Sequence, residues 1–247
     1  MDDIVSLASM ILLAFLVAGF VKGVIGLGLP TVAMGLLSLA LPPVQAAAIL
    51  LVPSLATNIW QAVVGPSFWP LLRRMATMLL GIWAGALGGA AFLIQPDARA
   101  TAGLGLALMA YAVLGLSPLS LSAPKRAQVW LAPTVGIVTG LITAATGVFV
   151  LPAGPYLQAI GLARDELVQA LGISFTVSTL ALAAALGVAG ALPHALAGAS
   201  LLAVLPAIAG MVAGQAIRQR ISPAAFRRWF FFGLLALGAH LVARAVL

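Results

Sequence analysis

The chain has 247 residues, of which 63% are hydrophobic and 7% are charged, and its formal net charge is +7. A soluble globular protein cannot cover its surface with so few charges, so the composition excludes that class and predicts a polytopic integral membrane protein. The positive charge does not indicate nucleic acid, because cytoplasmic loops of membrane proteins carry excess Lys and Arg beside anionic lipid. The chain has no cysteine, which excludes disulfides, thiolate metal sites and cysteine nucleophiles.

The apolar runs predict helices. They are too long for membrane strands, which alternate and run about ten residues, and a helix satisfies its backbone hydrogen bonds internally. The expected fold class is therefore all-α, with about ten hydrophobic segments. The chain begins with Met1-Asp2-Asp3, without the positive residues of a secretory signal, so the first apolar run is expected to stay in the membrane.

Prolines, glycines and charges divide the chain into ten predicted segments. They are 4–25, 29–41, 44–64, 74–94, 100–117, 127–146, 148–160, 166–189, 196–216 and 224–244. The second and seventh are short, since a crossing helix needs about 20 residues. The second lies between Pro30 and Pro42-Pro43, and the seventh contains Pro152 and Pro155. The sequence leaves open whether these two cross fully or are re-entrant.

Loop charges orient the segments, because positive residues collect on the cytoplasmic side. If all ten segments cross and the acidic amino terminus is outside, most basic residues fall inside, and only Arg99 and Arg244 fall outside. The inside set is Arg73, Arg74, Lys125, Arg126, Arg164, Arg218, Arg220, Arg227 and Arg228. Lys22 belongs to neither set, because it lies within the first segment.

The chain also repeats itself. Gly19-Phe-Val-Lys22-Gly23 resembles Gly136-Ile-Val-Thr139-Gly140 at an offset of 117, and Gly85-x-x-x-Gly89 resembles Gly210-x-x-x-Gly214 at an offset of 125. Residues 1–120 and 121–247 are therefore expected to be two membrane repeats that form one transmembrane domain. Five segments per repeat is an odd number, so the second repeat would be inverted, as in many secondary transporters, whose sites lie at the repeat interface.

Lys22 is the only charged residue between Ile4 and Leu72. A cation inside a membrane segment faces protein or water and marks a substrate or ion path by default. The alternative is an interfacial residue, because Lys22 lies near the end of its segment and could extend to the headgroups. The neighbouring Gly19, Gly23, Gly26 and Gly28 favour the functional reading, since they let another group approach the backbone closely.

Two short segments begin with features that suit an anion. Gly26-x-Gly28-x-Pro30 leads into the second segment, and the free N–H groups of a helix amino terminus attract negative charge. Thr146-Gly147 precedes the seventh segment, with Thr146 as the expected N-cap. The two termini would form an anion cradle; the alternative is that both are only turns between helices.

Buried polar side chains collect in the third, sixth and eighth segments. These residues are Ser54, Thr57, Asn58 and Gln61; Thr139, Thr143 and Thr146; and Gln169, Ser174, Thr176, Ser178 and Thr179. Serine and threonine often bond to their own helix backbone, so each is either structural or in contact with substrate. Amides cost more to bury than hydroxyls, which favours a role for Asn58 and Gln61.

The acidic residues limit the chemistry. Asp2, Asp3, Asp97, Asp165 and Glu166 are all expected at termini or loops, His194 in a loop and His240 in the last segment. No pair of buried acids or His-Glu set is available for an intramembrane protease or metalloenzyme. We therefore expect no enzyme, no catalytic residue, no metal and no cofactor. The candidate substrate-binding residues are Lys22, Gly26, Gly28, Thr57, Asn58, Gln61, Thr143, Thr146, Gly147 and Ser174.

The glycine-rich stretch from Gly19 to Pro30, Pro42-Pro43, the polar third segment and the duplication together resemble the sulfite exporter TauE/SafE family, which belongs with the toluene sulfonate uptake permeases. The resemblance covers essentially the whole chain, most strongly residues 16–75. It implies transport of sulfite, thiosulfate, sulfonates or related organic anions across the bacterial inner membrane. The second repeat departs from the pattern, because its turn reads Ile142-Thr-Ala-Ala-Thr146-Gly147, with threonines and alanines in place of glycines.

The sequence thus predicts a multi-pass permease of the bacterial inner membrane that moves a small sulfur-containing or organic anion by alternating access. The alternative is a membrane assembly or accessory protein that does not transport. The expected partners are a small anionic substrate and the lipid bilayer, with a homodimer as one option and no nucleic acid.

Overall fold

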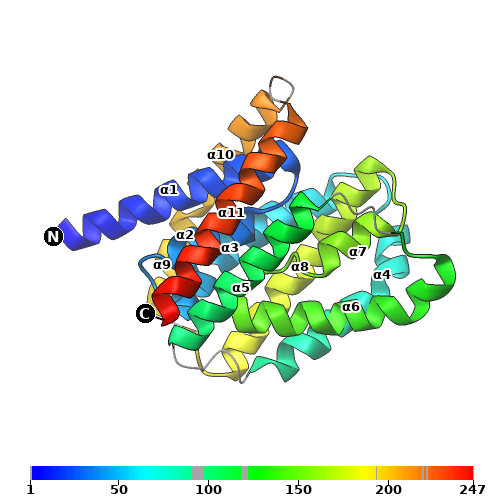
Figure 1. Ribbon diagram of the computed structural model, residues 1–247, viewed down its shortest axis with the longest axis horizontal. Helices are drawn as coiled ribbons and strands as arrows, with labels where there is room; N and C mark the ends of the chain where they lie inside the picture. The colour runs from blue at the N-terminus through cyan, green and yellow to red at the C-terminus, as the bar shows by residue number, and fades with distance from the viewer. Residues whose placement is uncertain are drawn as a thin grey trace. The chain divides into compact units, whose positions relative to one another are not determined.

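A computed structural model describes residues 2–90, 97–117, 122–192, 194–218, 220 and 222–246. Within these ranges all regular secondary structure is helical, which confirms the all-α fold class (Figure 1). Seven helical stretches there are long and apolar enough to cross a membrane: α1, α3, α5, α6, α8, α9 together with α10, and α11. The protein is a multi-pass membrane protein.

The helices follow the predicted segments closely. The first five are α1 (Asp2–Ile25), α2 (Leu29–Leu37), α3 (Pro43–Val63), α4 (Phe68–Gly88) and α5 (Asp97–Leu116). The others are α6 (Lys125–Thr146), α7 (Ala153–Ala159), α8 (Arg164–Val188), the 3-10 turn η2 (His194–Leu196), α9 (Ala197–Leu202), α10 (Val204–Ile217) and α11 (Pro223–Val246). The second and seventh segments are indeed short helices, of 9 and 7 residues.

The described helices form two compact units. The first unit contains Met1–Pro53, Pro96–Ser117 and Pro193–Leu247, and the second contains Ser54–Gln95 and Pro118–Leu192. Helix α3 passes from one unit to the other between Pro53 and Ser54. Each unit therefore draws helices from both halves of the sequence.

In the first unit, α1 and α10 pack in parallel along small residues. A Cβ at Gly19 would overlap the carbonyl oxygen of Ala207, and one at Gly23 would overlap that of Met211. The contact is reciprocal, because a Cβ at Gly210 or Gly214 would overlap a carbonyl oxygen of α1, that of Leu16 or Phe20. Glycine lets the two backbones approach closely, as small residues do between membrane helices.

The second unit contains the same arrangement between α6 and α4. Gly136 and Gly140 face the carbonyl oxygens of Met78 and Ile82, while Gly81 and Gly85 face those of Pro133 and Ile137. Every residue of α6 in this set lies 117 positions after its counterpart in α1, and every residue of α10 lies 129 positions after its counterpart in α4.

This correspondence changes the register that the sequence indicates for α4 and α10. The counterparts of Gly210 and Gly214 are Gly81 and Gly85, and not Gly85 and Gly89. Both pairs have the same spacing, so the sequence alone could not separate them. The packing partners do, because Gly89 lies near Ala144 and Leu141 and does not take the place of Gly214.

Helices α5 and α11 form an antiparallel pair in the first unit (Figure 1). A Cβ at Gly105 would lie 2.7 Å from the carbonyl oxygen of Gly238, and one at Gly238 would lie 2.7 Å from that of Gly105. At the other end of the pair, Arg227 donates to the carbonyl oxygen of Gly115 at 3.0 Å. The Tyr111 and Phe231 rings meet edge to face between these points, with centroids 5.1 Å apart.

Candidate functional site

Lys22 lies in the last turn of α1, in the first unit. Its side chain is only 4% exposed. An interfacial lysine that extends to the headgroups keeps its ammonium group in water, so this burial favours the reading in which Lys22 faces the interior of the protein. The position of Lys22 is set by α1, because Gly19 and Gly23, on either side of it in the sequence, pack closely on α10.

The residues after Lys22 turn the chain into α2. The Gly26 N–H donates to the Lys22 carbonyl oxygen at 2.7 Å, and both Gly26 (φ 80°) and Gly28 (φ 102°) take the left-handed conformation that suits glycine. Gly28 is the N-cap of α2, with Pro30 in the first turn and no side chain capping the helix. The first N–H groups of α2 therefore begin within a few residues of the buried cation.

The corresponding turn of the second unit is held by threonines. Gly147 takes φ 70°, and its N–H donates to the Thr143 carbonyl oxygen at 2.8 Å. The Thr146 hydroxyl donates to the Ile142 carbonyl oxygen at 2.7 Å and accepts from the Val148 N–H at 3.2 Å. The Thr143 hydroxyl donates to the Val148 carbonyl oxygen at 3.4 Å. These bonds shape the turn itself.

Thr146 does not have the expected place at the start of the seventh segment. It is the last residue of α6, whereas α7 begins at Ala153 with Pro152 as its N-cap. Residues 147–152 between them are not helical. The sequence argument placed the helix start directly after Gly147, whereas α7 begins only after Pro152.

The amides of α3 meet α8 within the second unit. Asn58 donates to the Thr179 hydroxyl at 3.5 Å, and Gln61 donates to the Val168 carbonyl oxygen at 2.8 Å. Thr57 donates to the Ser54 carbonyl oxygen at 3.3 Å, in its own helix. Of the candidate residues, Asn58 and Gln61 thus join α3 to α8, and Thr57 is buried beside them in the sequence.

Gln169 is a buried polar residue whose role the sequence did not reveal. Its amide donates to the carbonyl oxygens of Ala62 at 2.8 Å and Gly65 at 3.0 Å, and it accepts from the Ser67 N–H at 3.0 Å. These groups lie at the end of α3 and in the loop before α4, where backbone groups lack helical partners. Gln169 therefore fixes the α3–α4 loop to α8. The signal available in the sequence for this role was an amide side chain within an otherwise apolar helix.

Several buried hydroxyls of the second unit have no hydrogen-bond partner. They are the Oγ atoms of Ser54, Ser174 and Ser178 and the Oγ1 atom of Thr139, in side chains that are all 0% exposed. An unpaired buried hydroxyl costs about 1–3 kcal/mol. Ser174, a candidate from the sequence, is thus free to bond a ligand, whereas Thr146 uses its hydroxyl within the turn.

The described residues contain no group of three or more His, Cys, Asp or Glu side chains that could hold a metal ion. The polar side chains that are buried there are amides, hydroxyls and Lys22. Lys22, Gly26 and Gly28 belong to the first unit, and the other candidates belong to the second.

Residues 11–241 match the family described as Sulfite exporter TauE/SafE. The chain belongs to this family. The match covers nearly all of the two units, so it does not depend on the glycine-rich first segments alone. No curated protein and no solved structure matches the chain. Membership of the TauE/SafE family implies that the protein is a membrane transporter.

Proposed function

We propose that this TauE/SafE protein is a secondary transporter that moves sulfite, a sulfonate or a similar small organic anion across the bacterial inner membrane by alternating access. The observation that carries the proposal is the burial of Lys22 in an apolar helix, directly before the turn into α2. A cation is retained at such a position for a function, because an apolar residue would cost less to bury.

A neutral donor in the second unit also suits an oxyanion. The buried Ser174 hydroxyl has no hydrogen-bond partner among the described residues. The five acids of the chain lie at the starts of helices α1, α5 and α8. A cationic substrate would therefore lack a carboxylate partner within the spans, whereas an anion has both a counter-charge and donors.

The repeated packing supports alternating access. The α1–α10 and α6–α4 pairs are equivalent, and α5 contacts its own counterpart α11 in a reciprocal, antiparallel manner. An antiparallel contact between equivalent helices is what an inverted repeat produces. We infer that residues 1–120 and 121–247 are inverted copies, the design with which many secondary transporters expose one site alternately to each side.

Uptake into proteoliposomes tests the proposal directly. Vesicles containing the purified protein should accumulate labelled sulfite or a taurine-like sulfonate faster than empty vesicles, and unlabelled anion should compete. If the chain is instead an accessory protein that does not transport, the two kinds of vesicle should accumulate the anion equally.

A binding experiment tests the charge of the substrate. Sulfite or methanesulfonate should raise the unfolding midpoint of the detergent-solubilised protein, because a ligand that binds the native state stabilises it. Methylammonium of similar size should not. A larger shift with the amine would refute an anion site.

A further inference from the structure

We propose that Thr139, the second repeat's counterpart of Lys22, contacts the transported anion. Its hydroxyl group would donate a hydrogen bond to one of the anion's oxygens. The inference rests on the proposed function and adds a residue that determines specificity.

The packing of the two units establishes the correspondence between Thr139 and Lys22. Lys22 lies between Gly19 and Gly23, which pack on the backbone of α10, and Thr139 lies between Gly136 and Gly140, which pack on the backbone of α4 in the same register. Each residue therefore has the same position on its helix relative to an equivalent helix–helix contact. Both are buried, at 4% and 0% exposure.

The hydroxyl of Thr139 lacks the helical hydrogen bond that four other threonines of the second unit make. Thr134, Thr146, Thr176 and Thr179 each donate to the carbonyl oxygen four residues earlier, at 2.7–2.8 Å. This is the ordinary way in which threonine satisfies its hydroxyl in a helix. Thr139 makes no such bond, and its Oγ1 atom has no hydrogen-bond partner.

A buried hydroxyl without a partner is costly, and valine has nearly the same shape without that cost. The bound substrate would offset this cost if it brought an acceptor to the hydroxyl. Sulfite and sulfonate oxygens are strong acceptors, and a hydrogen bond to a charged group is the stronger kind. A neutral hydroxyl adds little long-range attraction, so Thr139 would select the geometry of the anion and not its charge.

The test compares Thr139→Val and Thr139→Ser with the wild-type full-length protein in detergent. Two quantities are measured: the unfolding midpoint without ligand and the Kd for sulfite. Thr139→Val should keep or raise the midpoint, because it removes an unpaired polar group, and should weaken sulfite binding about tenfold or more. Thr139→Ser should bind nearly as the wild type does. Thr134→Val is the matched control, because Thr134 is an exposed threonine of the same helix, and its Kd should not change.

The outcomes separate this inference from the proposed function. If the wild type binds sulfite and Thr139→Val binds it equally well, Thr139 is a core residue, and the anion-permease assignment stands without it. A lowered midpoint for Thr139→Val would show that the hydroxyl already has a partner in the free protein and would also refute the inference. If the wild type binds neither sulfite nor sulfonates, the proposed function and the role of Thr139 are both refuted.

Discussion

At the scale of single residues, two kinds of polar group are buried in this protein. Gln61 and Gln169 use their amides to bond backbone groups of neighbouring segments, so they hold helices and loops in place. Thr139 and Ser174 are equally buried, and their hydroxyl oxygens have no hydrogen-bond partner among the described residues. Burial alone does not distinguish these two kinds, whereas their bonding partners do.

Replacement of Lys22 should separate charge from packing. Lys22→Ala should raise the Kd for sulfite about tenfold or more and reduce transport, because a charge-assisted hydrogen bond is worth about 1.5–3 kcal/mol. Lys22→Arg should retain part of both, since it keeps the charge with a different shape. Binding and proteoliposome uptake are the measurements, and Lys125→Ala, at the exposed start of α6, is the control. Normal transport by Lys22→Ala would show that this lysine is an interfacial anchor.

At the scale of secondary-structure elements, the proline inside α3 is compensated by a side chain from another helix. Pro53 lies inside α3 and has no N–H to donate to the carbonyl oxygen of Ile49. Ser200 of α9 donates to that oxygen at 2.8 Å and accepts from the Val52 N–H at 3.2 Å. A distant serine thereby replaces the hydrogen bond that proline removes, close to the point where α3 passes between the units.

This substitution of one donor for another predicts a non-additive pair of mutations. Ser200→Ala should lower the free energy of unfolding by about 1–3 kcal/mol, because it leaves the Ile49 carbonyl oxygen buried without its donor. Pro53→Ala should offset much of this loss in the double variant, since alanine restores the helical N–H. A double-mutant cycle of unfolding midpoints measures the coupling. Simple additivity would contradict the exchange of donors.

The glycines that join α1 to α10 and α4 to α6 should tolerate no larger side chain. Gly210→Ala should destabilise the protein by about 1–3 kcal/mol, because its Cβ would overlap the Leu16 carbonyl oxygen. Gly187→Ala, near the end of α8, is the matched control, since nothing lies within 4 Å of the Cβ that it would add. Unfolding midpoints of the two variants provide the comparison, and equal effects would contradict close packing at Gly210.

At the scale of the whole molecule, the directions of the helices lead to a prediction about whether the short segments cross. The Ala123 N–H donates to the Ala159 carbonyl oxygen at 2.9 Å, and Arg74 donates to the Ile160 carbonyl oxygen at 3.0 Å. The end of α7 thus lies beside the start of α6, so the chain has returned to the end of the unit at which α6 begins. Six non-helical residues and seven helical ones can span up to about 30 Å, the thickness of the hydrocarbon core. We infer that residues 147–160 cross fully.

Helix directions extend this result to α2. If α7 crosses, the antiparallel contact of α5 with α11 follows from the order of the described helices, because four crossings separate them. The parallel contact of α1 with α10 then requires that α2 crosses as well. Seven described helical stretches are long and apolar enough to span a membrane. The crossing of all ten segments, with the positive residues on one side, stays a prediction.

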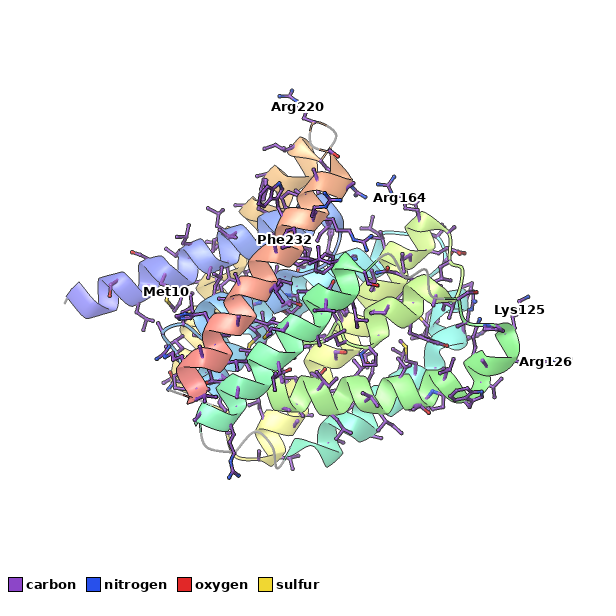
Figure 2. The ribbon with its side chains drawn as sticks, viewed as in Figure 1. Met10, Lys125, Arg126, Arg164, Arg220 and Phe232 are labelled. Carbon is purple, nitrogen blue, oxygen red and sulfur yellow. The ribbon has the colours of Figure 1, made fainter. Side chains whose placement is uncertain are left out.

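Cysteine labelling tests this topology in a chain that has no cysteine of its own. Figure 2 shows Arg126 at the start of α6 and Arg164 at the start of α8, both exposed. Arg126→Cys and Arg164→Cys should react with an impermeant maleimide from the same side, whereas Arg99→Cys should react from the opposite side. Labelling of the first two from opposite sides would mean that the seventh segment is re-entrant.

The sequence by itself determined the class of the protein, its helices and its family resemblance, because apolar run length, charge placement and glycine motifs are local properties that the bilayer selects. It also identified Lys22 and the polar third and eighth segments. The tertiary structure decided what depends on partners distant in the chain: that Gly81, and not Gly85, is the counterpart of Gly210, that Ser200 serves the break at Pro53, and that Thr139 has an unused hydroxyl whereas Thr146 does not. Hydrogen bonds and backbone approaches join residues more than a hundred positions apart, and no local pattern records which partner a polar group will find.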